Sequence, residues 1–176
     1  MRVFISIDLP DEIRREIGKI QKQIPEFIGK ETESENLHLT LKFLGEIDEK
    51  LLEETKRRLK KIKFSGFESK LGDLGFFDKG DSGIVWIYLS SCEDLQKEID
   101  VALKALFEPE KRFMSHLTIA RIKKIKNKKK FLEDLKRIKT PIFSFKVSDF
   151  KLKKSTLKKT GSVYENLEIY PLKNEI

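Results

Sequence analysis

The chain has 176 residues, of which 39% are apolar, and a formal net charge of +8. This length suits one domain or two small lobes that share a core. A single cysteine excludes an intramolecular disulfide and a cysteine-based metal cluster. No segment reaches the roughly 18 apolar residues of a membrane helix. The first nine residues read as a strand and not as a signal peptide, so we expect a cytoplasmic protein without membrane association.

The positive charge is concentrated in the second half of the chain. Residues 1–88 hold 16 Lys/Arg and 17 Asp/Glu, whereas residues 89–176 hold 21 and 12. Ten of the 19 residues over 121–139 are basic. Such a surface attracts an anionic partner such as RNA. The alternative is a solvated surface of the kind found in thermophiles, because Lys and Glu dominate the charged residues.

Apolar periodicity predicts alternating strands and helices along the whole chain. In chain order we expect a strand over 3–9, a helix opened by Pro10 and Asp11, a strand over 37–44, a helix capped by Asp48, an extended segment over 67–77, a turn over 78–83, a strand over 84–90, a helix with a capping box from Ser91 to Asp94, a strand over 115–122, a helix capped by Asn127, a strand over 142–150, a basic loop over 151–160 and a strand over 163–170.

The order strand, helix, strand, helix, strand occurs twice. We interpret this as an internal duplication with approximate repeats 1–80 and 81–150, followed by the C-terminal strand over 163–170. Two similar halves that face each other would leave a cleft between them. Because no Pro/Gly/Ser-rich linker separates the halves, we expect residues 1–176 to form one two-lobed domain.

The only two histidines each open a His-Leu-Thr triplet, at His38 and at His116. The chance of such a match is roughly 2 in 100,000, which is far below the false-positive level of most short motifs. Residues i and i+2 of a strand share a face. His38 and Thr40 therefore point one way and the flanking leucines point into the core, and His116 and Thr118 repeat this arrangement.

Two histidines in one cleft are suited to acid–base catalysis. Near neutral pH one imidazole can carry a proton while the other does not. The hydroxyls of Thr40 and Thr118 can hold phosphate oxygens between them, and Arg121 can add charge-assisted contacts. Without carboxylates at ligand spacing, the histidines make a poor zinc site, and Asp8 is a weak candidate ligand. The sequence also lacks nucleotide-binding glycine loops and a G-x-S-x-G elbow. We therefore expect neither a metal nor a cofactor.

At these residues the sequence resembles the RNA 2′,3′-cyclic phosphodiesterases, also called 2′-5′ RNA ligases, of the two-histidine phosphoesterase superfamily. The similarity spans nearly the whole chain. The stretches that carry it are 2–10, 36–45 and 116–121, with a looser match at Ser155-Thr156-Leu157, Gly161 and Tyr164.

The resemblance implies an α+β fold of two pseudo-symmetric lobes, with antiparallel sheets facing across a central cleft and helices outside. It implies hydrolysis of a terminal 2′,3′-cyclic phosphate to a 2′-phosphate, and the reverse reaction as 2′-5′ ligation. His38 would be the proton donor and His116 the proton acceptor, with Thr40, Thr118 and Arg121 binding the phosphate. The implied partner is RNA with a cyclic phosphate end, such as a tRNA half, and we expect a monomer from a thermophilic archaeon.

Three further residues are candidates for contact with RNA or a base: Tyr164, Phe43 and Ser155. Tyr164 alternates away from Val163 and can stack on a base. Phe43 follows Leu41 on the inward face, so we favour a core position for it. Two rival functions stay open: an RNA-end binding module without turnover, and a phosphodiesterase for small cyclic nucleotides or 2′-5′ oligoadenylates. Binding alone would not require two titratable groups, so the paired triplets favour an enzyme.

Overall fold

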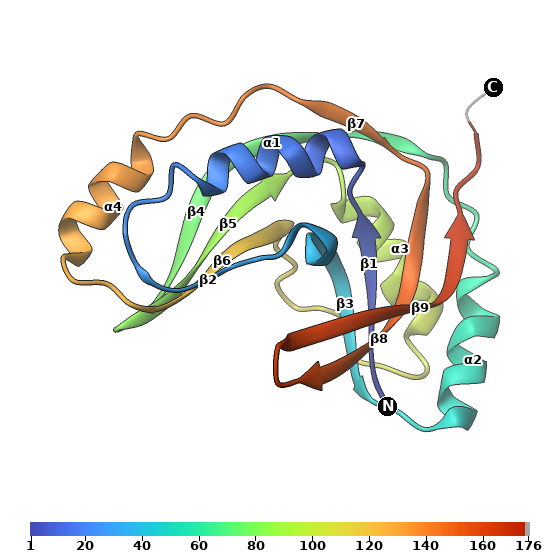
Figure 1. Ribbon diagram of the computed structural model, residues 1–176. Helices are drawn as coiled ribbons and strands as arrows, with labels where there is room; N and C mark the ends of the chain where they lie inside the picture. Colours follow the sequence, from blue (N-terminus) through green and yellow to red (C-terminus); the bar gives the residue numbers. More distant parts are fainter. Residues whose placement is uncertain (175–176) are drawn as a thin grey trace.

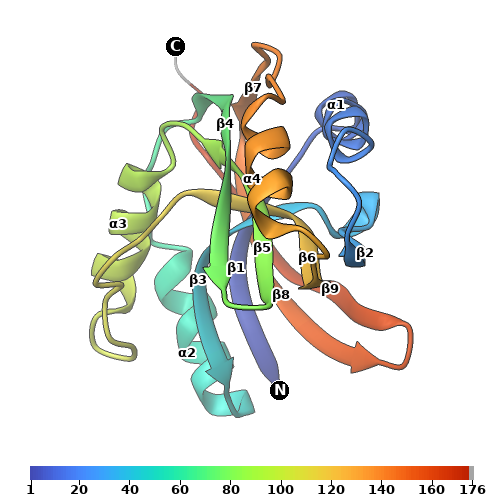
Figure 2. The ribbon, with the colours of Figure 1, turned by 90° about the vertical axis from the view of Figure 1, so that its left-hand side faces the viewer.

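Two antiparallel sheets form the framework of the computed structural model, which describes residues 1–174 (Figures 1 and 2). One sheet has the strand order β3-β1-β8-β9 and the other the order β2-β6-β5-β4-β7. The strands are β1 (Arg2–Asp8), β2 (Ile28–Glu31), β3 (His38–Glu46), β4 (Phe67–Lys79), β5 (Ser82–Leu89), β6 (His116–Lys124), β7 (Ser144–Val147), β8 (Asp149–Lys158) and β9 (Gly161–Pro171). The helices are α1 (Asp11–Gln21), α2 (Glu49–Leu59), α3 (Glu93–Leu103) and α4 (Lys128–Lys136), with a 3-10 turn, η1, at Ser34–Asn36.

Each helix buries apolar residues of one face in the core. Ile13, Ile17 and Ile20 of α1 are almost fully buried, as the spacing of three to four residues predicts. Of the predicted caps, two are confirmed: Asp48 accepts from the Leu51 N–H (2.8 Å) and Asn127 from the Lys130 N–H (3.1 Å). The α+β class with two antiparallel sheets is confirmed. No helix within residues 1–174 is long and apolar enough to cross a membrane.

Helices α1 and α3 each follow a strand of one sheet but contact a strand of the other sheet. Helix α1 follows β1 of the four-stranded sheet but packs beside β6 of the five-stranded sheet, where Gln21 Nε2 donates to the Ile119 carbonyl (3.0 Å). Helix α3 follows β5 of the five-stranded sheet, but its Asp100 binds Lys42 on β3. Strands β3 and β6 contact each other between the sheets. The two strands that carry the triplets therefore lie at the centre of the molecule (Figure 1).

Three predictions about the elements were wrong. The capping box at Ser91 does not form, because Ser91 adopts φ 67° and α3 begins after Cys92 without a side-chain cap. The predicted strand over 142–150 is divided between β7 and the start of β8. The predicted basic loop over 151–160 is most of β8, which pairs with both β1 and β9. Strand β2 was missed, because all four of its residues are exposed and show no alternation.

The sheets do not divide at the predicted repeat boundary. The order β1-α1-β3-α2 recurs as β5-α3-β6-α4, but strands are exchanged between the halves. Strands β2 and β4 lie before residue 80 and belong to the five-stranded sheet, while β8 and β9 complete the four-stranded one. Residue 80 itself lies in the tight turn between β4 and β5. The internal duplication therefore remains a prediction from the sequence.

Candidate active site

Strands β3 and β6 bury their residues in the same order. In each nine-residue strand the His and Thr of the triplet are half-buried, while the residue after each of them is buried. The alternation then breaks, because two consecutive residues are buried: Leu41 and Lys42 in β3, and Ile119 and Ala120 in β6. The partner strands show a register shift at the same places. Each strand therefore contains a β-bulge just after its triplet.

The bulges decide which way the residues after the triplets point. In a regular strand the fifth residue after a histidine would point away from it. The extra bulge residue reverses this, so Phe43 and Arg121 lie on the same face as the triplets and line the cleft. The prediction of a core position for Phe43 is therefore wrong, since its side chain is 66% exposed.

A cleft of about 590 Å³ lies where the two sheets meet. It brings together the eight residues to which the sequence assigned a catalytic, phosphate-binding or RNA-contact role: His38, Thr40, Phe43, His116, Thr118, Arg121, Ser155 and Tyr164. Asp8, the weak candidate metal ligand, does not line it. Sequence reasoning missed Lys30, Glu31 and Glu33 of the cleft wall, because they belong to or follow the unpredicted edge strand β2. Lys30 Nζ donates to the Thr160 carbonyl (3.1 Å), so this wall also contacts the β8–β9 hairpin.

Both imidazoles are oriented in the same way. Nδ1 of His38 lies 2.7 Å from the Asn36 carbonyl oxygen, and Nδ1 of His116 lies 2.8 Å from that of Met114. A carbonyl can only accept, so Nδ1 carries the proton in each ring and Nε2 is the atom free for chemistry. Nε2 of His38 lies 3.0 Å from the Thr40 hydroxyl. Aromatic neighbours also pack against the two rings. The ring centroid of Tyr164 lies 5.0 Å from that of His38, and the ring centroid of Phe77 lies 5.1 Å from that of His116.

His38 is neutral in the free protein at neutral pH. Burial is the largest cause and lowers the pKa of His38 to about 4. The Asn36 carbonyl and the Asp8 carboxylate act in the opposite direction, while the positive charges of Lys153 and Arg121 lower the pKa further. An anion in the cleft would offset those two positive charges and favour the protonated ring.

Asp8 is engaged by two lysines. Its Oδ1 accepts from Lys153 Nζ (2.6 Å) and its Oδ2 from Lys151 Nζ (3.0 Å). Burial raises the pKa of Asp8, but the two ammonium groups outweigh this and hold it below 3.8. Within residues 1–174, no group of three His, Cys, Asp or Glu side chains is arranged to hold a metal ion.

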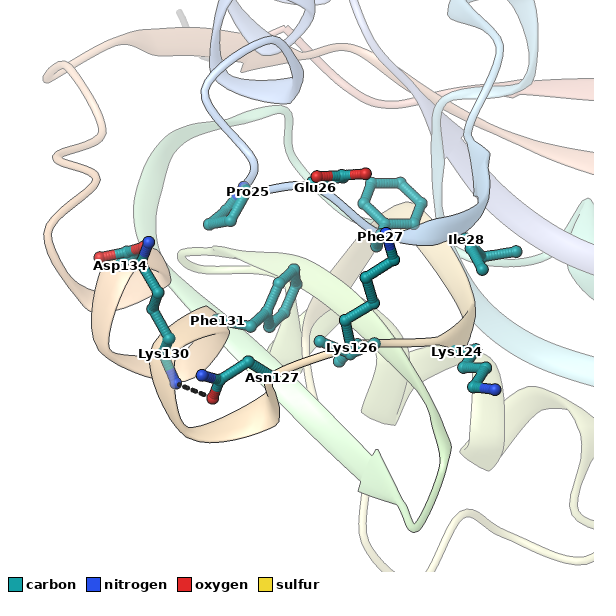
Figure 3. A pocket seen from close by; sticks show the side chains of 11 residues that line it. Pro25, Glu26, Phe27, Ile28, Lys124, Lys126, Asn127, Lys130, Phe131 and Asp134 are labelled. Carbon is teal, nitrogen blue, oxygen red and sulfur yellow. Dashed lines mark hydrogen bonds between the residues drawn. The ribbon is translucent and has the colours of Figure 1, made fainter.

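A second, smaller pocket of about 360 Å³ lies apart from the triplets (Figure 3). It is formed by the segment before β2, the end of β6 and helix α4, with Phe27 and Phe131 among its apolar residues. Lys124, Lys126 and Lys130 line it and belong to the basic stretch over 121–139. Strand β6 thus contributes Arg121 to the central cleft and Lys124 to this pocket.

Comparison with known proteins gives one consistent answer. A family model described as LigT-like phosphoesterase matches residues 7–86 and 90–164. A Methanocaldococcus jannaschii protein named RNA 2′,3′-cyclic phosphodiesterase is 39% identical, covering 94% of this chain and 97% of its own. An Archaeoglobus fulgidus protein of the same name is 33% identical, covering 97% and 99%.

Solved structures agree with the sequence comparisons. A crystal structure of a Thermus thermophilus protein superposes with a TM-score of 0.84 at 26% identity, covering all of both chains. Escherichia coli LigT in complex with 3′-AMP superposes with a TM-score of 0.78 at 25% identity, covering 97% of each chain.

Proposed function

The chain belongs to the LigT-like phosphoesterase family, and from this premise we propose that it is an RNA 2′,3′-cyclic phosphodiesterase that produces a 2′-phosphate. The observation that supports this most is the shared cleft: two imidazoles with Nδ1 held by carbonyls, two threonine hydroxyls and one guanidinium. The names of the relatives support RNA as the substrate. A tRNA half as the natural substrate, a monomeric state and a cytoplasmic location stay predictions.

In the proposed reaction the cyclic phosphate lies between the two histidines. His116 Nε2 takes a proton from water, and the water oxygen bonds to phosphorus. The bond from phosphorus to the ribose 3′-oxygen breaks, and His38 Nε2 gives its proton to that oxygen. Thr40, Thr118 and Arg121 hold the non-bridging oxygens. Attack by the 5′-hydroxyl of a second RNA in place of water would form a 2′-5′ linkage, with the 3′-oxygen again as the leaving group that His38 protonates.

The assignment of His38 as proton donor places a requirement on the substrate. Free His38 has a pKa of about 4 and lacks the proton that a donor needs at neutral pH. The bound phosphate is negatively charged and must therefore raise the pKa of His38 before the 3′-oxygen can leave. Proton uptake would accompany substrate binding.

The proposed function predicts one phosphate isomer as product. An oligonucleotide with a 2′,3′-cyclic phosphate end, incubated with the protein in excess EDTA, should give the 2′-phosphate alone, because a fixed pose presents only the 3′-oxygen to the donor. Phosphorus NMR of the product measures this. Binding without any product would favour the rival binding module. A mixture of 2′- and 3′-phosphates would contradict a fixed pose, and equal kcat/KM for a cyclic mononucleotide would favour a small-molecule substrate.

Phe43 is expected to contact the RNA. Its ring is exposed at the rim of the cleft on the face of the triplets, where a base can stack on it. Phe43→Ala should raise KM for cyclic-ended RNA several-fold, since stacking contributes about 1–3 kcal/mol per base, and should leave the melting temperature unchanged. Ile142→Ala is the control, because Ile142 is also exposed but does not line the cleft. Equal KM values for the two variants would contradict the contact.

RNA binding should weaken as salt rises, and the lysines of the second pocket should account for part of that dependence. Each phosphate contact contributes about 0.7 to the slope of log affinity against log salt for a single strand. Neutralising Lys124, Lys126 and Lys130 to glutamine should flatten the slope. Three exposed lysines of the acidic half serve as a matched control: Lys50, Lys61 and Lys63. Equal slopes in the two triple variants would indicate an ordinary solvated surface.

A further inference from the structure

The two triplets differ in what lies opposite them on the neighbouring strand. Asp8 of β1 pairs with His38, whereas Tyr88 of β5 occupies the matching place opposite His116. Tyr88 donates its hydroxyl to Glu93 at the surface. Asp8 instead accepts from both Lys151 and Lys153 in the interior. One histidine therefore has a charged cluster beside it, and its counterpart has a neutral phenol.

The charged cluster is largely buried. The side chain of Lys153 is 8% exposed and that of Asp8 18%. Buried ion pairs contribute little stability, and apolar residues of similar size often replace them without loss. One carboxylate faces two ammonium groups, so the cluster carries a net positive charge. None of its three residues lines the cleft, so the cluster lies outside the set of groups proposed to hold the phosphate.

We propose that Lys153, held in place by Asp8, is a positioning residue whose charge adds to the burial of the ring in favouring the neutral form of His38 until an anionic phosphate enters the cleft. The inference rests on the proposed function, because it assumes that the phosphate binds beside His38. A buried positive charge disfavours a second one nearby. The incoming anion offsets that charge, and His38 then takes up the proton that it gives to the leaving oxygen. His116, opposite a neutral tyrosine, is not subject to this control.

Several other charges face His38 and must be weighed with Lys153. Arg121 of β6 also lowers the pKa of His38, Asp8 raises it, and burial of the ring is the largest cause. The other titratable side chains that line the cleft are Arg2, Lys30, Glu31, Glu33, His116 and Tyr164. The test must therefore separate the influence of Lys153 from that of the cleft as a whole.

Variants that remove a positive or a negative charge from the cluster separate the influence of Lys153 from that of the rest of the cleft. NMR titration of the histidine ring protons follows His38 and His116 in one sample, and His116 is the internal control. Lys153→Met should raise the pKa of His38 by at least about 0.5, and Asp8→Asn should lower it. Lys153→Arg keeps the charge and should titrate like the native protein. Shifts of the same sign in Lys153→Met and Asp8→Asn, or equal shifts at both histidines, would show a structural role and overturn the proposal.

Inorganic phosphate provides a second arm that needs no variant. It should raise the pKa of His38 in the native protein, and by less in Lys153→Met, where one cation fewer is left for the anion to offset. If Lys153→Met does not fold, Lys153→Gln takes its place. If neither variant folds, Lys153→Arg decides, and a His38 titration in Lys153→Arg that differs from the native protein overturns the proposal. If the native protein hydrolyses cyclic-ended RNA but the His38 titration does not change in the variants, this inference alone is wrong. If the native protein shows no turnover, the proposed function is wrong.

Discussion

Replacing His38 or His116 by alanine should lower kcat on a cyclic-phosphate RNA by at least about 100-fold, the usual contribution of a general acid or base. They are the only two histidines in the chain, so no other imidazole can substitute for either one. Quenched-flow or gel assays at saturating substrate measure the loss. Thr40→Val and Thr118→Val should cost less, because each removes one hydroxyl from a set of phosphate contacts.

The loss should be catalytic and not structural. Both histidines are half-buried at the cleft surface, so their removal does not empty a core position. The melting temperatures of His38→Ala and His116→Ala should stay close to that of the native protein, and cyclic-ended RNA should still bind. Near-normal turnover in either variant would contradict the two-histidine mechanism, whatever the other variant does.

Asp100→Ala should lower the free energy of unfolding by about 3–5 kcal/mol, the usual cost of removing one partner from a buried ion pair. Lys42 Nζ, on a side chain that is 2% exposed, donates to Asp100 Oδ1 (2.6 Å) and to the Glu108 carbonyl (2.7 Å). Asp100 also accepts from Gln96 Nε2 and the Glu110 N–H. Without the carboxylate, a buried ammonium at the bulge of β3 keeps only the more distant and more exposed Glu110 carboxylate (3.8 Å) as its counter-charge.

Denaturant unfolding measures this loss, and Glu98→Ala is the control. Glu98 lies on the same helix but is exposed, so its removal should change stability by no more than about 0.5 kcal/mol. The double variant Lys42→Met/Asp100→Leu should recover much of the stability, because both charges leave together. A small effect of Asp100→Ala would show that water reaches Lys42.

The same pair predicts how stability depends on acid. Burial raises the pKa of Asp100, but the hydrogen bonds from Lys42, Gln96 and the Glu110 N–H outweigh it and bring the pKa below 3.8. A carboxyl whose pKa is lower in the folded state contributes stability above its unfolded pKa. That contribution should disappear as the pH falls below about 3.8, and Asp100→Asn should be less sensitive to acid over that range.

Local signals in the sequence predicted most of the site. The triplets, the caps at Asp48 and Asn127 and the isoleucine stripe of α1 depend on neighbours within a few residues, so they are readable without a fold. The bulges are not readable in this way. The charge of Lys42 indicates an outward position, but Asp100 on a distant helix binds it in the interior, and Phe43 was misplaced for that reason.

Long-range partners also explain the missed strands. Residues 151–160 are rich in lysine, which is typical of a loop, but Lys151 and Lys153 both bind Asp8 across the sheet, and β8 lies in the interior of that sheet. Strand β2 is an exposed edge with no apolar pattern, and its pairing with β6 comes from the fold and not from its own residues. The wall residues Lys30 and Glu31 were unpredictable for the same reason.

The exchange of strands between the halves sets the order in which the molecule can assemble. Strand β1 is synthesised well before its partner β8, which begins at Asp149, so the four-stranded sheet cannot be completed until β8 and β9 have been made. Pairings this distant in sequence are slow to form, since a long loop must close before any contact compensates for it. Fragments 1–80 and 81–176 would each lack strands that the other supplies. Mixed together, they should form a folded complex that neither forms alone, and phosphodiesterase activity should appear only in the mixture.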